Sequence, residues 1–240
     1  MQVTFLGSGA AFSPSAYNAS ILVDQTLLLD AGAPLCVHLP RVGVPLDQPA
    51  AVLITHFHAD HCFNLALLIA ARHELFPASP PLAILGPRGT EHWLRQLLDL
   101  AWGEKFRQAA WEHLALTVQE LDEGRGAEVA GYRVRAFRMA HVSTWTCLGY
   151  LLEKHGVRLG YTGDSAPGPG LDALIQACDH VIAEMTYDQP GKIHLARQEV
   201  EGLMRRHPSV RFILTHRGSD RPLDGAVLAR DFLTLQLPLA

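Results

Sequence analysis

The sequence lacks several features that would point to particular classes of protein. Its four cysteines, Cys36, Cys62, Cys147 and Cys178, are far apart and form no Cys-x-x-Cys pair, so neither a zinc knuckle nor a disulfide framework is indicated. No apolar run approaches the roughly 18 residues of a membrane-spanning helix. No basic segment followed by a long apolar stretch marks the amino terminus. We therefore expect a protein of the reducing cytoplasm that makes no contact with a membrane.

The chain also has no excess of positive charge. Its formal net charge is −4, so RNA binding would require a local basic patch rather than a general attraction. Arg133, Arg135 and Arg138 could form a basic strand edge, although three arginines are more often a solvated face. Apolar residues make up 48% and charged residues 18%, which supplies a core and argues against disorder. No linker or low-complexity segment divides the 240 residues. We expect a single domain over 1–240 with two similar halves, roughly 1–115 and 116–240.

One short stretch, residues 56–61 with the sequence His-Phe-His-Ala-Asp-His, is rich in metal-binding groups. It follows the apolar run Ala51–Ile54, which predicts a buried strand, and precedes a longer run, Leu65–Leu75, which predicts a helix. Open α/β sheets place their ligands in such loops, at the carboxyl ends of strands. Buried imidazoles and carboxylates need partners, and together they suit zinc, manganese or iron. The alternative is a chance cluster of histidines, which the strand–loop–helix context argues against.

This hexapeptide resembles the signature of the metallo-β-lactamase-fold hydrolases. The opening of the chain is similar to that family as well, because a strand leads to the small-residue loop Gly7–Ala11 and then to a hairpin that ends in Leu27–Gly32. Asp30 in that segment is expected to be a turn residue or a support for the site. Strand candidates followed by helices occur twice along the chain, and the second series includes a strand over Glu128–Met139 and a final helix from about Leu223 to Leu233. This pattern suggests two sheets packed face to face with helices outside. The expected fold is α/β, a four-layer αββα sandwich.

The remaining ligands of a two-metal site should also follow strands, and three residues do. They are His141 after Val134–Met139, Asp164 after Val157–Thr162, and His216 after Arg211–Thr215. Each alone is more often a structural or surface residue, but all three occur in the order His, Asp, His that the family shows. The resemblance implies one metal on His56, His58 and His141, a second metal on Asp60, His61 and His216, and Asp164 as the bridge between them.

The chemistry of such a site follows from the cations. Two divalent ions about 3.5–4 Å apart share a bridging water and lower its pKa from near 16 toward about 7, which supplies hydroxide as the nucleophile at neutral pH. The same ions neutralise charge that grows on a phosphoryl or carbonyl oxygen. We expect two divalent metal ions, Zn²⁺ in the first place, with Mn²⁺ or Fe as alternatives because imidazole and carboxylate accept all three.

Two further residues match a proton relay of the ribonuclease Z-like members of the family. Glu184 stands where that branch has a glutamate, and His194 where it has a histidine. A hydrogen-bonded imidazole can protonate the leaving oxygen as a general acid. The predicted catalytic residues are His194 and Glu184 of this relay, together with Asp60 of the hexapeptide. The alternative for His194 is a polar residue at the start of a helix.

The predicted substrate depends on the length of the interval between His141 and Asp164. The resemblance is strongest to ribonuclease Z-like phosphodiesterases, whose transfer-RNA-processing members carry a long arm between the equivalents of His141 and Asp164. Here only residues 142–163 lie in that interval, so we predict a small or short phosphodiester, such as a cyclic nucleotide, rather than structured RNA. The alternatives are a ribonuclease Z-like RNA endonuclease, a lactone, thioester or β-lactam hydrolase, and a non-catalytic metal-binding module. The sequence leaves a homodimer open.

Overall fold

Two seven-stranded sheets form the middle of the computed structural model, which describes residues 1–219 and 221–239. The first sheet has the order β14-β1-β2-β3-β4-β5-β6 and consists of β1 (Gln2–Gly7), β2 (Ser20–Val23), β3 (Leu27–Leu29), β4 (Ala51–Leu53), β5 (Ala83–Pro87), β6 (Thr117–Leu121) and β14 (Thr234–Gln236). The second has the order β13-β12-β11-β10-β9-β8-β7 and consists of β7 (Gly126–Val129), β8 (Tyr132–Met139), β9 (Cys147–Lys154), β10 (Val157–Tyr161), β11 (His180–Glu184), β12 (Arg211–Thr215) and β13 (Ala226–Leu228).

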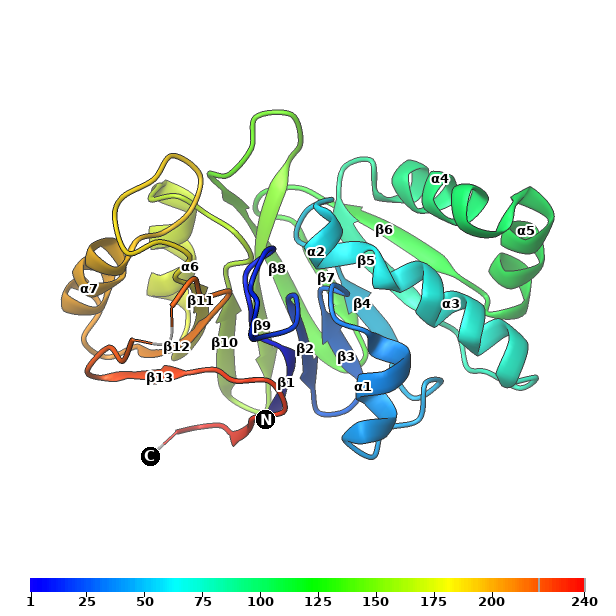
Figure 1. Cartoon of the computed structure of the whole chain (residues 1–240), viewed down its shortest axis with the longest axis horizontal. Coiled ribbons are helices and arrows are strands. Elements are labelled where there is room, and N and C mark those ends of the chain that lie inside the picture. The colour runs from blue at the N-terminus through cyan, green and yellow to red at the C-terminus, as the bar shows by residue number, and fades with distance from the viewer. Residues whose placement is uncertain (220, 240) are drawn as a thin grey trace.

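Helices cover the outer face of each sheet. The helices of the first half are α1 (Leu35–Arg41), the single turn α2 (Ala59–Cys62), α3 (Asn64–Leu75), α4 (Thr90–Trp102) and α5 (Glu104–His113). Those of the second half are α6 (Pro169–Ala177) and α7 (Arg197–Arg206), which lie on the opposite side of the molecule (Figure 1). The layers therefore run helix, sheet, sheet, helix, as the sequence predicts.

The alternation of side chains along the strands explains why the strand sequences are almost continuously apolar. In β3, Leu27 and Leu29 belong to the core between the two sheets, whereas Leu28 belongs to the core under α1 and α3. Successive side chains of a strand point to opposite faces, so a strand buried on both faces needs apolar residues at every position. A third core lies between the second sheet and helices α6 and α7, where Leu174 and Leu203 are buried.

Several local expectations are corrected by the structure. The helix expected from about Leu223 to Leu233 is wrong, because this segment contains β13, which pairs with β12, and the amide of Ala229 donates to the carbonyl of Leu214. The strand predicted over Glu128–Met139 is two strands, because Ala130 and Gly131 both have positive φ and turn the chain. The hexapeptide is a loop only in its first half, since α2 begins at Ala59.

The strands that precede the predicted ligands end on the same edge of the molecule. Strands β3 to β6 are parallel to one another, as are β10 to β13, and β9 is antiparallel to both β8 and β10. Strand β8 therefore runs in the direction of β10, and the ends of β8, β10, β11 and β12 lie at one edge of the second sheet. The two sheets meet near this edge, where the amide of Leu148 donates to the carbonyl of Thr55.

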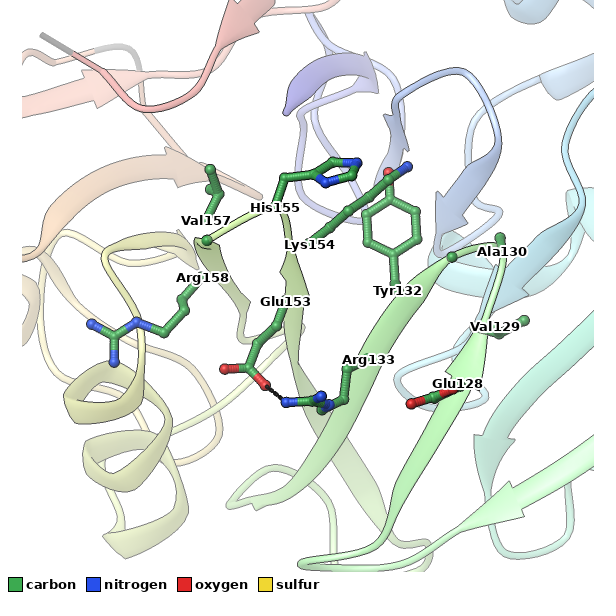
Figure 2. Close-up of a pocket in the computed structure, with 12 residues that line it drawn as sticks. Glu128, Val129, Ala130, Tyr132, Arg133, Glu153, Lys154, His155, Val157 and Arg158 are labelled. Carbon is green, nitrogen blue, oxygen red and sulfur yellow. Dashed lines mark ion pairs between the residues drawn. The ribbon is translucent and has the colours of Figure 1, made fainter.

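The opposite edge of the second sheet carries a separate open hollow of about 640 Å³. It lies between the β7–β8 and β9–β10 turns, where Arg133 faces Glu153 and Lys154 lies beside Tyr132 (Figure 2). None of the predicted site residues lines it. Among the described residues, no helix has the length and apolar character needed to cross a membrane.

Candidate metal centre

The seven predicted metal-binding side chains meet at the edge where the strands end. The ligand atoms of His56, His58, His141 and Asp164 all lie within 4.8 Å of one another. A second group with the same spacing is formed by Asp60, His61 and His216. We call these the first and the second cluster. His141 is 83 residues from His58 in sequence, and His216 is 156 residues from Asp60, so only the fold brings them to the hexapeptide.

The first cluster points three imidazole nitrogens at one another. His58 Nδ1 lies 3.0 Å from His56 Nε2 and 3.2 Å from His141 Nε2. The other ring nitrogen of His56 donates to Thr55 Oγ1 at 3.0 Å, and that of His141 donates to the carbonyl of Ile193 at 2.7 Å. Both rings therefore present a bare Nε2 to the cluster. Lone pairs this close repel one another unless a proton or a cation lies between them.

In the second cluster, too, each histidine has one ring nitrogen held by an acceptor and the other directed into the cluster. His61 Nδ1 donates to Asp30 Oδ2 at 2.8 Å, and His216 Nδ1 donates to Thr186 Oγ1 at 2.9 Å. The bare Nε2 atoms lie 3.5 Å and 3.2 Å, respectively, from Asp60 Oδ2. In metal sites the second ring nitrogen of a ligating histidine is held in this way by a carboxylate, a carbonyl or another acceptor.

Asp164 lies between the two clusters. Its Oδ1 is 3.3 Å from His61 Nε2, and its Oδ2 is 3.8 Å from both His56 Nε2 and His141 Nε2. Within the described part of the chain, His61 Nε2 and Asp164 Oδ1 are buried and have no hydrogen-bond partner. An unsatisfied buried pair is costly, whereas divalent cations use both groups as ligands. The donor set of imidazoles and carboxylates therefore fits two divalent metal ions.

Two threonines, which the sequence analysis did not single out, support the histidines in equivalent ways. Thr55 Oγ1 donates to Asp30 and accepts from His56, and Thr186 Oγ1 donates to Glu184 at 2.5 Å and accepts from His216. Each threonine thus links a buried carboxylate to a histidine and fixes its tautomer. Thr55 directly precedes the hexapeptide and could have been suspected, but Thr186 is 30 residues from His216 and carries no local signal.

Burial and charge set the protonation of the clusters. Burial lowers the pKa of His56, His58 and His141, which favours the neutral imidazole that binds metals. Burial alone would raise the pKa of Asp164, but the neighbouring His216 and His61 outweigh it and hold this pKa well below the ordinary value. Burial alone would lower the pKa of His61, but Asp164 and Asp30 outweigh it and raise this pKa well above the ordinary value. The centre is therefore built around ionised carboxylates.

His194 and Glu184 lie directly beside the centre. His194 Nδ1 donates to Glu184 Oε1 at 2.9 Å, and the His194 ring is 4.9 Å from the ring of His141 and 5.6 Å from that of His216. Burial raises the pKa of Glu184. Burial alone would lower the pKa of His194. The hydrogen bond to Glu184 and the negative charge of that carboxylate outweigh burial and raise this pKa above its ordinary value. The bond leaves Nε2 of His194 as the donor on the side away from Glu184.

A pocket of about 490 Å³ opens beside the second cluster. One wall is the segment Ser8–Ala16, and the other contains Thr186, Tyr187, His194, His216 and Arg217–Ser219. The C-terminal Asp231 holds the first wall, because its carboxylate accepts from the amide and hydroxyl of Ser8 at 2.9 and 2.8 Å and from the amide of Tyr17 at 2.9 Å. No local sequence pattern indicates this support, because Asp231 is 214 residues or more from its partners.

Other candidates have structural partners. The Cys62 thiol is buried and donates to the carbonyl of His58 at 2.9 Å, so it supports the loop from behind. Of the arginines considered for RNA binding, Arg133 pairs with Glu153 at 3.8 Å and Arg135 lies over the ring of Phe137. Both lie on β8, which is an inner strand between β7 and β9 rather than an edge.

Comparisons with known proteins show which family the chain is similar to. A family model described as "Anti-Pycsar protein Apyc1" matches residues 1–224. A ribonuclease Z of Mycolicibacterium gilvum is 31% identical over 186 residues, which is 72% of this chain and 65% of that protein, so the alignment spans slightly less than two thirds of the relative.

Solved structures share the whole fold. The short form of human tRNase Z superposes with a TM-score of 0.79 at 24% identity and covers 100% of both chains. The metallo-β-lactamase-fold protein YhfI of Bacillus subtilis superposes with a TM-score of 0.78 at 18% identity and covers 98% of both chains. The predicted metallo-β-lactamase-like sandwich is confirmed.

Proposed function

Because the chain belongs to the family described as "Anti-Pycsar protein Apyc1", and with it to the ribonuclease Z-like hydrolases of the metallo-β-lactamase fold, we propose that it is a two-metal phosphodiesterase that acts on a small or cyclic phosphodiester. The single observation that supports this most is the His194–Glu184 pair beside both clusters, since a hydrogen-bonded acid is what a leaving alkoxide needs.

The seven side chains of the two clusters would hold two divalent ions, and Zn²⁺ is the expected metal. When bound, these ions supply hydroxide at neutral pH and neutralise charge on the phosphoryl oxygens. The protein's own contribution is orientation. Thr55 and Thr186 hold His56 and His216 in the tautomer that binds cations, and Asp30 does the same for His61.

His194 would protonate the leaving oxygen from Nε2. Glu184 fixes the orientation of the imidazole by accepting from Nδ1, and Glu184 itself is held by the amide of Ser165 at 2.7 Å. His194 also lines the 490 Å³ pocket, so the alcohol that leaves would lie in that pocket. Glu184 thus acts through His194 and positions the acid.

The lining of the pocket supports a small substrate. Among the described residues that line it, none is acidic and none is a lysine, and the guanidinium of Arg217 donates to the carbonyls of Ser219 and Ala229 at 2.8 Å each. Such a wall suits a sugar or base better than a chain of phosphates, which basic side chains would bind. The interval after His141 is a short loop followed by the β9–β10 hairpin, which leaves little surface for gripping a structured RNA.

The second candidate function is an RNA endonuclease, which the similarity to a named ribonuclease Z favours. Carbonyl ester hydrolysis is a third candidate. It would use the same hydroxide but has less need of the acid His194. Location in the cytoplasm and the assembly of two copies stay predictions.

Turnover of four kinds of substrate by the zinc-loaded protein tests the proposal. We expect hydrolysis of bis-p-nitrophenyl phosphate and a nucleoside cyclic phosphate, and little cleavage of precursor transfer RNA or a panel of lactones. His194→Ala should lower phosphodiester turnover by roughly 10²- to 10⁴-fold with both metals retained, because the general acid is lost. His92→Ala, an exposed histidine on α4, is the matched control. Parent-like phosphodiester turnover by metal-loaded His194→Ala would reject the relay, and turnover of lactones alone would reject the phosphodiesterase.

A further inference from the structure

The loop between β8 and β9, residues 140–146, carries a large aromatic side chain at the metal centre. This loop rises above the two sheets at the edge where the strands end (Figure 1). Trp145 lies on it and is 41% exposed, although its ring centroid is only 5.5 Å from that of His58, which belongs to the first cluster. A half-exposed indole forfeits part of the free energy that burial would give.

Trp145 is held by an aromatic column rather than by the loop alone. Its ring is 6.0 Å from that of Phe57, which is stacked on Trp93 at 5.3 Å with an interplanar angle of 16°. Phe57 is buried in the core under α3 and α4, and Trp93 packs against the same core. The position of the indole is therefore set by the rigid part of the molecule, as is typical of a preformed binding surface.

The position of Trp145 restricts what it can contact. The pocket for the leaving alcohol touches His194 and His216, whereas Trp145 touches His58, so the two flank the centre on different clusters. A group stacked on Trp145 would belong to the molecule whose phosphate lies at the clusters. Its neighbours Ser143, Thr144 and Thr146 are uncharged, which suits a neutral flat ring and not a second phosphate.

We propose that Trp145 is a stacking platform for the nucleobase of a nucleotide substrate and makes the enzyme prefer phosphodiesters that carry a base. The proposal rests on the proposed phosphodiesterase function and deepens it. Base–aromatic stacking is tolerant of sequence because every base has a π-face. The platform therefore selects nucleotides as a class and does not distinguish strongly among bases.

Equilibrium binding to the zinc-loaded protein tests the platform without any need for hydrolysis. Adenosine 5′-monophosphate and ribose 5-phosphate have the same sugar and phosphate and differ in the base. By calorimetry we expect the parent to bind the nucleotide about tenfold more tightly than the sugar phosphate. Trp145→Ala should abolish this preference and leave ribose 5-phosphate binding unchanged, whereas Trp145→Phe should retain most of it. Trp102→Ala is the matched control, since Trp102 is 45% exposed on α4 and contacts Phe106.

Two results would overturn the platform. One is nucleotide binding by Trp145→Ala that equals that of the parent. The other is an equal loss for both ligands, which would make Trp145 a cover for His58. Failure of the phosphodiesterase would be visible separately, as an absence of turnover in a parent that still prefers the nucleotide. Zinc content and thermal unfolding of each variant show that the centre and the fold are intact.

Discussion

At the scale of single residues, the arrangement of the two clusters depends on groups that belong to neither cluster. Asp30 has a φ of 59°, accepts from Thr55, His61 and Tyr161, and is fully buried. Glu184 has the corresponding place in the second half, where it accepts from Thr186, His194 and Ser165. Each carboxylate organises one set of histidines, so the precision of the site rests on these two buried anions and the threonines they hold.

Removal of one hydroxyl should test this support. Thr186→Val keeps the shape of the side chain but leaves Nδ1 of His216 without its acceptor. We expect the affinity for one of the two zinc ions to fall roughly 10- to 100-fold, as for other supporting groups of metal ligands. Thr186→Ser should stay close to the parent because it keeps the hydroxyl.

Competition with a chromophoric chelator measures both affinities. Thr117→Val, an exposed threonine on β6, controls for loss of a hydroxyl elsewhere. Equal zinc affinities in the parent and Thr186→Val would show that the threonine does not orient His216.

Asp24, a carboxylate distant from the centre, makes the stability of the folded protein depend on pH. Asp24 lies in the β2–β3 turn with a φ of 45° and accepts from the Tyr132 hydroxyl at 2.5 Å, the amide of Gln2 at 2.6 Å and Lys154 at 3.3 Å. Burial alone would raise the pKa of Asp24, but these donors outweigh it and lower the pKa from 3.8. A carboxylate whose pKa is lowered on folding stabilises the folded state above its ordinary pKa, and this contribution is lost as the pH falls through the lowered value.

Asp24→Asn should lower the free energy of unfolding by about 1–3 kcal/mol at pH 7, because an amide cannot accept on both sides. Asparagine tolerates the positive φ, so the turn itself is preserved. The difference from the parent should shrink as the pH falls below 3.8. Urea unfolding of both proteins from pH 7 to pH 3 measures this, and a difference that is constant over the whole range would contradict the assignment.

At the scale of elements, the hexapeptide at residues 56–61 is packed against the end of the first hairpin. An added Cβ on Gly32 would lie 1.7 Å from the carbonyl oxygen of Asp60. In the same contact, the amide of Ala31 donates to the carbonyl of His61. The segment after β3 therefore forms the wall that sets the position of α2 and, with it, of Asp60 and His61.

Gly32→Ala should displace α2 and destabilise the protein by about 1–3 kcal/mol through overpacking. It should also weaken zinc binding at the second cluster. Gly202→Ala on α7 is the control, because the nearest atom to its Cβ would be 3.6 Å away and the exchange favours the helix by about 0.5–1 kcal/mol. Thermal unfolding with and without chelator compares them, and equal behaviour of the two variants would refute the proposed contact.

The elements also show what can be read from sequence alone. Strands such as β4 and β12 are predictable because they are short, branched and buried on both faces, and their ends locate the candidate ligands. Helix α5 is hard to predict because only Arg107 and Ala110 among its residues are buried. Its sequence therefore shows little of the apolar repeat that marks an amphipathic helix. The segment around β13 has helical composition, but its backbone bonds go to β12, and no local pattern reveals such a partner. The supporting roles of Thr186 and Asp231 cannot be predicted from sequence for the same reason, because their hydrogen-bond partners are distant in sequence.

At the scale of the whole molecule, the centre joins the two sheets. The hexapeptide follows β4 of the first sheet, and His141, Asp164 and His216 follow β8, β10 and β12 of the second. The last strand, β14, pairs with β1, so the C-terminal segment with Asp231 closes the first sheet and supports the pocket wall. We propose that the chain forms one domain on this basis, and a division into two similar halves near residue 115 stays a prediction.

The claim that the two clusters hold two catalytic cations is tested most directly by a zinc titration of the chelator-stripped protein. The rate of bis-p-nitrophenyl phosphate hydrolysis is measured against equivalents of Zn²⁺ added per chain. We predict almost no activity without metal and a rise that ends at two equivalents. Full activity in the metal-free protein, or a rate that does not respond to added zinc or to other divalent ions, would contradict it.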